Sequence, residues 1–215
     1  MISGIAIALT CLLPPTASLA APESAAPPDP AALVARLRRD APALTPYREI
    51  RFVQMLDAPL LLAGELAYDA DGTLVKRVTA PYSETTRIAG SQVTIERKGK
   101  PRRSFSLKRA PALAGFLESF GATLAGDAAR LARSYTLAST GNATRWQLDL
   151  APRDAALSKH VTRVRIDGSG DTPRCFRVEE AGGDSSFLLV DTLAAHALAE
   201  TPTPAALDQL CRTSP

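Results

Sequence analysis

The sequence predicts a mainly β fold of the α+β class, with about eleven antiparallel strands. Beyond Tyr47, short runs rich in branched and aromatic residues recur at roughly 8–12-residue spacing, with the side-chain period of two that strands show. Glycine, proline, aspartate and asparagine lie between the runs and favour the tight turns of hairpins. One segment, 111–133, instead carries apolar residues at helical spacing. We therefore expect one antiparallel sheet with a single helical insertion.

The strand pattern can be divided along the chain as follows. The expected strands cover residues 48–56, 61–68, 73–79, 83–89, 91–97, 102–108, 134–140, 144–150, 160–167, 174–180 and 184–193. An N-terminal helix is expected over about residues 30–40, because Asp29-Pro30 provides an N-cap and a first-turn proline before an apolar stripe.

The composition is that of a folded chain with little chemistry available for catalysis. A hydrophobic share of 46% excludes a disordered tail, and a formal net charge of +3 is too small for the basic field that nucleic-acid binding needs. His160 and His196 are the only histidines, and neither has a carboxylate at catalytic spacing. The sequence lacks the common nucleophile, phosphate-loop and metal-ligand motifs. We expect no enzymatic activity, no metal site, no cofactor and no nucleic-acid partner.

The first residues have the pattern of an export signal. An apolar run covers Ile5 to Leu13, and small residues at Ser18 and Ala20 suit cleavage after Ala20. This run is far shorter than the roughly 20 residues that span a bilayer as a helix. We expect residues 1–20 to be a signal peptide, residues 21–30 a flexible leader, and the mature protein to be periplasmic. Lipidation at Cys11 is the alternative, although the residues before it fit that modification poorly.

The mature chain would keep two cysteines, Cys175 and Cys211. In an oxidising compartment this even pair predicts a disulfide between the body, residues 31–195, and a C-terminal tail, residues 196–215. Two unpaired buried thiols are the alternative.

A basic run lies where the fifth and sixth expected strands turn: Lys98-Gly99-Lys100-Pro101-Arg102-Arg103. Most such runs are solvated hairpin tips. The functional alternative is a docking patch for an acidic partner or for anionic lipid headgroups.

An ordered string of short motifs extends over roughly residues 48–190. The motifs are Phe52-x-Gln54, Gly64-Glu65-Leu66, Leu74, Val78-Thr79-Ala80-Pro81, Ile88-x-Gly90, Val93 with Ile95, Leu124-x-Gly126-Asp127, Trp146-x-Leu148-x-Leu150-x-Pro152, Ile166-x-Gly168 and Gly183-Asp184-Ser185. Their order and spacing are more specific than any single motif, and together they resemble a divergent branch of the periplasmic outer-membrane lipoprotein carrier family, the LolA-like family.

The resemblance implies a half-open, strongly curved antiparallel β-barrel with an apolar concave face and a helical lid. The lid would be residues 111–124, with the apolar side chains Leu113, Phe116, Leu117, Phe120 and Leu124. Strand alternation gives the expected cavity-lining residues Phe52, Leu66, Tyr68, Val78, Ile88, Val93, Trp146, Leu148, Phe176 and Phe187. The alternative is that these side chains form a permanent core.

One departure from the family concerns the lid. The family's carriers have an Arg-Pro pair after the strand that matches Gly64-Glu65-Leu66, and its arginine locks the lid by hydrogen bonds. Here Asp69-Ala70-Asp71-Gly72 occupies that region, and Arg77 and Arg87 are the candidate substitutes.

We therefore expect a monomeric carrier for lipoprotein acyl chains or for another lipid or polyene product. Its partners would be an inner-membrane exporter and an outer-membrane acceptor. The alternatives are a non-catalytic accessory subunit of an inner-membrane lipid exporter and an acceptor of the LolB type.

Overall fold

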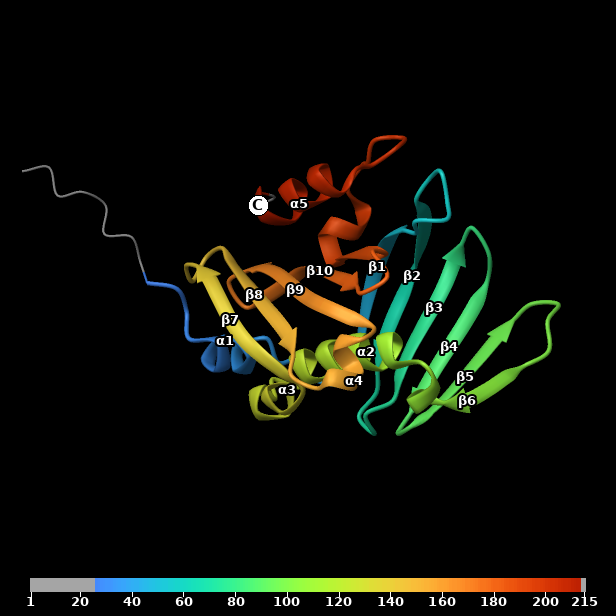
Figure 1. The fold of residues 1–215 in the computed structure, drawn as a ribbon, viewed down its shortest axis with the longest axis horizontal. Helices are drawn as coiled ribbons and strands as arrows, with labels where there is room; N and C mark the ends of the chain where they lie inside the picture. Colours follow the sequence, from blue (N-terminus) through green and yellow to red (C-terminus); the bar gives the residue numbers. More distant parts are fainter. Residues whose placement is uncertain (1–25, 214–215) are drawn as a thin grey trace, which may run out of the picture.

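The computed structural model describes residues 26–213, apart from the side chains of residues 111–113, 116 and 118. The expected signal peptide therefore lies outside the described residues. Eleven strands form one antiparallel sheet in the order β6-β5-β4-β3-β2-β1-β11-β10-β9-β8-β7. The sheet curls strongly but does not close, because β6 and β7 stand at opposite ends of this order (Figure 1). The predicted fold class and strand number are confirmed.

The strand bounds agree with the expected ranges within a few residues, except at both ends of β1. The strands are β1 (Ala43–Phe52), β2 (Leu60–Tyr68), β3 (Leu74–Ala80), β4 (Glu84–Ala89), β5 (Gln92–Arg97), β6 (Arg103–Ser106), β7 (Tyr135–Gly141), β8 (Trp146–Pro152), β9 (Val161–Ser169), β10 (Thr172–Glu180) and β11 (Ser185–Val190).

The bounds predicted for β1 are wrong at both ends. The strand begins at Ala43. Proline is tolerated at position 46 because β1 pairs there with β2 but not with β11, so the missing N–H of Pro46 does not interrupt a second ladder of hydrogen bonds. The expected final part of the strand, residues 53–56, leaves the sheet and belongs to an exposed loop. The apolar residues of this loop are therefore not explained by burial in the core.

Five α-helices and two short 3-10 turns accompany the sheet within residues 26–213. They are α1 (Pro30–Arg36), η1 (Leu107–Arg109), α2 (Pro111–Leu124), α3 (Ala128–Ser134), α4 (Ala155–Ser158), η2 (Asp191–Ala195) and α5 (Pro204–Thr213). The Asp29 side chain caps α1 by accepting from the Ala32 N–H at 2.8 Å, as its position predicts. The predicted helical insertion is two helices, α2 and α3, separated at Gly126. In the described part of the chain, none of the helices is both long and apolar enough to span a membrane.

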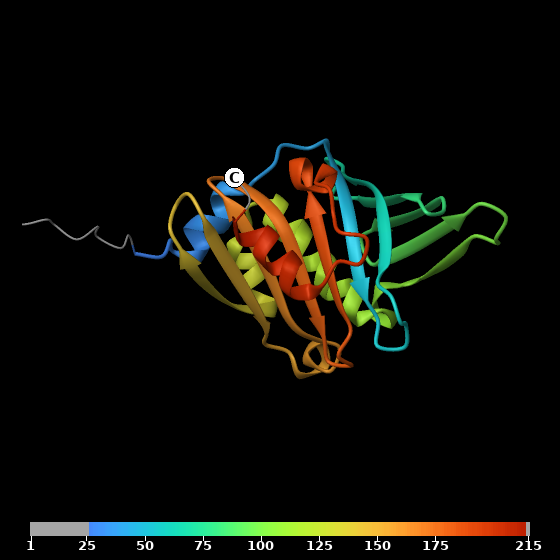
Figure 2. The ribbon, with the colours of Figure 1, turned by 90° about the horizontal axis from the view of Figure 1, so that it is seen from above.

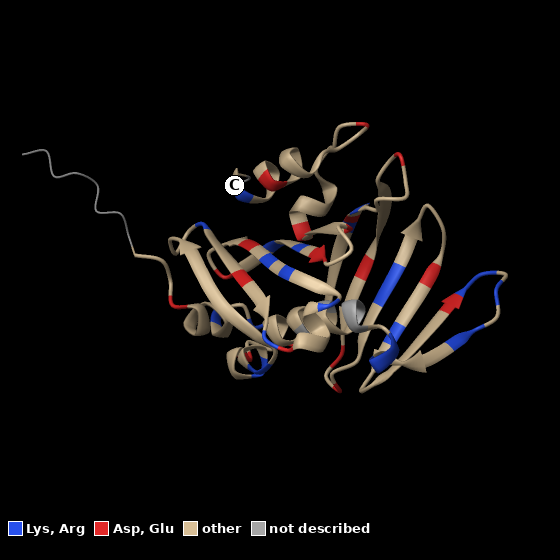
Figure 3. Cartoon of the chain, viewed as in Figure 1, with Lys and Arg blue, Asp and Glu red and all other residues tan. Residues whose placement is uncertain are grey.

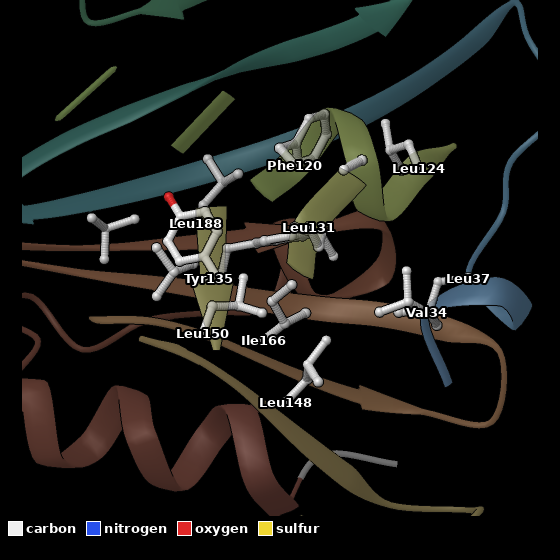
Figure 4. Packing of buried hydrophobic residues seen from close by; sticks show 14 of the residues in the cluster. Val34, Leu37, Phe120, Leu124, Leu131, Tyr135, Leu148, Leu150, Ile166 and Leu188 are labelled. Carbon is white, nitrogen blue, oxygen red and sulfur yellow. The ribbon is translucent and has the colours of Figure 1, made fainter. Parts of the chain in front are cut away.

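The concave face of the sheet carries the main core in one half only. Helices α1, α2 and α3 cover β7 to β10 there, and Leu37, Leu124 and Leu131 bring the three helices together over Leu148 and Ile166 (Figure 4). Glycine at position 168 is required at this place, because a Cβ would lie 2.1 Å from the Trp146 ring. This half of the concave face is sealed.

Helix α5 lies on the convex face, on the side of the sheet opposite α2 (Figures 1 and 2). A disulfide joins Cys211 of α5 to Cys175 of β10. Asp208 of α5 also accepts from the guanidinium groups of Arg165 and Arg177. The expected disulfide between the body and the C-terminal tail is therefore present, and the tail includes a helix that is fixed to the sheet.

Asp167, on β9, is a buried carboxyl group whose pKa is shifted by its surroundings. Its side chain is 3% exposed, and burial, opposed by Arg165 and reinforced by Asp208, raises its pKa to about 6 from an ordinary 3.8. The neutral acid is therefore the favoured form in the folded protein at mildly acidic pH.

This shift predicts a pH-dependent stability. Because the folded-state pKa exceeds the unfolded value, the contribution of Asp167 to the free energy of unfolding is greatest below pH 4 and declines by about 2–3 kcal/mol as pH rises to about 6. Between pH 4 and pH 7, the free energy of unfolding measured with urea should decrease more in the wild type than in Asp167→Asn. Parallel profiles for the two proteins would contradict the assignment.

Candidate functional site

The second half of the concave face is hollow. It holds a cavity of about 440 Å³ between the sheet and helix α2. Its wall includes the apolar residues Leu62, Leu66, Leu74, Val75, Val78, Ile88, Ile95, Leu117, Phe120, Val178 and Leu188. It also includes the polar residues Glu49, Arg51, Lys76, Tyr82, Glu84, Thr86, His160, Glu180 and Ser186. The volume falls within the range of about 300–1,000 Å³ that is typical of small-molecule sites.

Strand register orders these residues from one edge of the sheet inward. Arg51, Glu84 and Ser186 lie at strand ends next to the β1–β2, β3–β4 and β10–β11 turns. Leu74 and its partner Ile88 lie at the far ends of β3 and β4. The cavity therefore has a polar rim at one edge and an apolar floor, an arrangement that suits an amphipathic molecule.

An ion pair lies between the rim and the floor. Lys76 on β3 donates from Nζ to a Glu49 carboxylate oxygen on β1, reaching past β2. The two side chains are only 24% and 11% exposed, and the Lys76 ammonium also lies 5.3 Å from the centre of the Tyr47 ring. Partly desolvated charges of this kind are retained only when they are paired.

Tyr47 adds a buried hydroxyl to this region. The residue is 2% exposed, and its hydroxyl has no hydrogen-bond partner within the described part of the chain. Burial and the nearby groups Glu49, Tyr82 and Glu84 raise the pKa of Tyr47 far above its ordinary value. The phenol therefore stays protonated and keeps a hydrogen-bond donor beside the cavity wall.

Helix α2 covers the cavity unequally along its length. Its C-terminal part is fixed in the core at Leu124, whose carbonyl accepts from the Arg39 N–H at 2.8 Å. Near the middle, Phe120 contacts Phe176 with ring centroids 5.2 Å apart. Tyr135 donates to the carbonyl of Gly115 at 2.8 Å, and the missing Cβ of this glycine permits the close approach. Among the side chains of α2 that the structure describes, Leu117 and Phe120 line the cavity.

The structure brings part of the expected site together. Among the expected lining residues, Leu66, Val78 and Ile88 do line the cavity, as do the lid residues Leu117 and Phe120. Leu124 lies in the sealed core instead. The side chains of Leu113 and Phe116 lie outside the described residues.

The remaining expected lining residues lie elsewhere. Phe52 and Phe187 are on the convex face, with ring centroids 6.1 Å apart in the cluster under α5, because Glu49 and Arg51 set the opposite parity for β1. Val93 lies beside its strand partner Ile88 and packs in a cluster with Ile88 and Leu117, but it is not among the cavity-lining residues. Trp146, Leu148 and Phe176 belong to the sealed half of the concave face, where they form the permanent core considered as the alternative. Tyr68, on β2, is partly buried and packs against that core.

Neither of the two arginines considered as lid partners lines the cavity: Arg77 on β3 and Arg87 on β4 are both exposed instead. Lys76, which was not among the expected site residues, does line the cavity, farther from its edge than the rim residue Arg51. The signal for Lys76 was a charge between two apolar residues of the same strand face.

Comparisons with known proteins agree with this architecture. The chain matches the family described as outer membrane lipoprotein carrier protein LolA-like over residues 20–214. No curated protein matches it.

Similar solved structures were also found. A LolA superfamily protein, NE2245 from Nitrosomonas europaea, is 11% identical with a TM-score of 0.44, covering 79% of this chain and 93% of that protein. LprF from Mycobacterium bovis is 9% identical with a TM-score of 0.36, covering 82% and 93%. MucB in complex with MucA is 16% identical with a TM-score of 0.33, covering 81% of this chain and 62% of that one.

The ion pair can be tested by a mutant cycle. Lys76→Met leaves the Glu49 carboxylate poorly solvated and unpaired, so the free energy of unfolding should fall by about 2 kcal/mol. The double variant Lys76→Met with Glu49→Leu should recover most of this loss. Equal losses in the single and double variants, measured by urea unfolding, would show that the pair does not act as a unit.

Proposed function

Since this chain belongs to the LolA-like family of outer membrane lipoprotein carriers, we propose that it is a non-catalytic periplasmic carrier. It binds lipophilic cargo in the cavity under α2 and moves it toward the outer membrane. The cargo is a lipoprotein's acyl chains or another lipid or polyene product.

The observation that carries the proposal is the apolar floor of the cavity. Leu66, Leu74, Ile88 and Leu188 surround a space of about 440 Å³ that no side chain of the described residues fills. Each methylene moved from water into such a site contributes about 0.8 kcal/mol, so an acyl chain gains affinity without any catalytic group. The Lys76 ammonium, which lines the cavity, would meet a polar group at the end of that chain.

An accessory subunit that holds no cargo is the second candidate function. It would require a cavity too small or too polar for an acyl chain, and the apolar floor favours the carrier over it. A LolB-type acceptor would need a lipidated N-terminal cysteine. The intact mass of the mature protein distinguishes this lipidated acceptor from the carrier and the accessory subunit, because export with cleavage after Ala20 leaves an unmodified N-terminus at Ala21.

A cavity-filling substitution tests the binding site. Thr86→Trp places a large ring inside the cavity, since Thr86 lines it from the middle of β4. A hydrophobic fluorescent probe should bind about tenfold more weakly, as expected when about 1.4 kcal/mol of contact is lost. The matched control Thr85→Trp puts the same ring on the outer face of β4 and should leave the probe's dissociation constant unchanged. Equal effects of the two variants would remove the cavity as the binding site.

The cargo itself can be identified by native mass spectrometry of the protein purified gently from the periplasm of its own host. An acylated peptide released on denaturation would establish a lipoprotein carrier, and a free lipid or polyene a carrier for another export route. A protein that is empty and also fails to bind the fluorescent probe would favour the accessory subunit.

A further inference from the structure

The strand order places three hairpin turns along one edge of the sheet. In the series β1 to β6 every strand pairs with its neighbour in an antiparallel ladder, so alternate turns lie at the same edge. Residues 53–59, 81–83 and 98–102 make up this edge, which we call the turn edge (Figure 1). The β1–β2 turn is tied to the β10–β11 turn by the Gln54 N–H, which donates to Asp184 at 3.0 Å.

Large apolar side chains are exposed at the turn edge. In the β1–β2 turn, Met55 is 93% exposed and Leu56 is 45% exposed; beside that turn, the first two residues of β2, Leu60 and Leu61, are each more than 40% exposed. Only one other large apolar residue of the described chain, Leu44, is comparably exposed, and it lies at the opposite end of β1. Four exposed large apolar residues on a single hairpin are more than the surface of a monomeric protein usually carries in one place, and such clusters are typical of an interaction site.

Basic residues occupy the β5–β6 turn of the same edge. Lys98 and Lys100 are exposed there, and with Arg102 they form a shallow hollow that reaches Ser83 of the β3–β4 turn. Figure 3 shows Lys and Arg along this hairpin. Arg102 pairs with Glu96 at 3.3 Å, and Asp57 adds one acidic group to the β1–β2 turn. The surplus charge of the turn edge is nevertheless positive.

The polar rim of the cavity lies at this edge as well. Arg51 is the last residue but one of β1, next to the exposed β1–β2 turn, and Tyr82 belongs to the β3–β4 turn. A molecule entering the cavity at its rim therefore passes between the apolar and the basic turns.

We propose that the turn edge docks on a lipid bilayer with anionic headgroups. Met55, Leu56 and their neighbours enter the interface while Lys98 and Lys100 lie against lipid phosphates. The combination matches a membrane surface, since apolar side chains and nearby lysines each add to interfacial binding. Docking in this orientation brings the cavity rim to the membrane. This goes beyond the carrier function and does not require that cargo be bound.

Vesicle binding by the full mature chain tests the proposal. The protein should sediment with vesicles of phosphatidylglycerol and phosphatidylethanolamine, less with phosphatidylcholine vesicles, and less at high salt. Lys98→Glu with Lys100→Glu, and separately Met55→Ser with Leu56→Ser, should each lower the partition coefficient by about tenfold or more.

Matched controls make the same changes away from the turn edge. Arg38→Glu with Arg133→Glu reverses two exposed charges on α1's C-terminal side and on α3, and Leu44→Ser removes an exposed apolar residue. These variants should bind vesicles like the wild type. All variants should keep the wild-type midpoint of urea unfolding and the affinity for the fluorescent probe, so a failure of docking is distinct from a failure of the carrier function.

Two results would overturn the proposal. One is equal binding by the turn-edge and control variants. The other is a wild-type protein that does not bind anionic vesicles. A protein partner would then be the remaining candidate to bind the turn edge.

Discussion

The two ends of the open sheet set the constraint on which the rest of the structure depends. The chain must pass from β6 to β7, which are the outermost strands, and it does so through α2 and α3 across the concave face. Eleven strands at about 4.8 Å spacing make an arc of roughly 50 Å, whereas the 14 residues of α2 extend only about 21 Å. Helices therefore cover part of the apolar face, and the remainder becomes the cavity.

This division explains why a charged pair is tolerated inside an apolar wall. Glu49 and Lys76 line the cavity and their side chains keep 11% and 24% of their exposure, so neither charge is fully desolvated. Pairing removes most of the remaining desolvation penalty. The pair gives the cavity polarity between its rim and its apolar floor.

Much of the fold could be predicted from the sequence, because its determinants are local. Turn residues and a period of two predict the strands, and the segment 111–133 predicts the helices that cross the sheet. The site was harder, because β11 carries large apolar residues on both faces and β1 mixes charged and apolar residues on both faces: one face packs under α5 and the other faces the core and the cavity. Alternation alone thus could not assign Phe52 or Phe187 to a face. The position of α5, which settles the parity, depends on contacts between residues far apart in the chain.

The disulfide and the partly buried Asp208 contacts fasten α5 behind β9 to β11, whereas no helix of residues 26–213 lies behind β3 to β5 (Figure 2). These cross-links are therefore concentrated in the half of the molecule that holds no cavity. The strands β2 to β5 instead supply much of the cavity wall. Substitutions in this wall would change the shape and the lining of the cavity, while the sealed half would continue to fold. Related chains could therefore differ in their cavities and keep the same core.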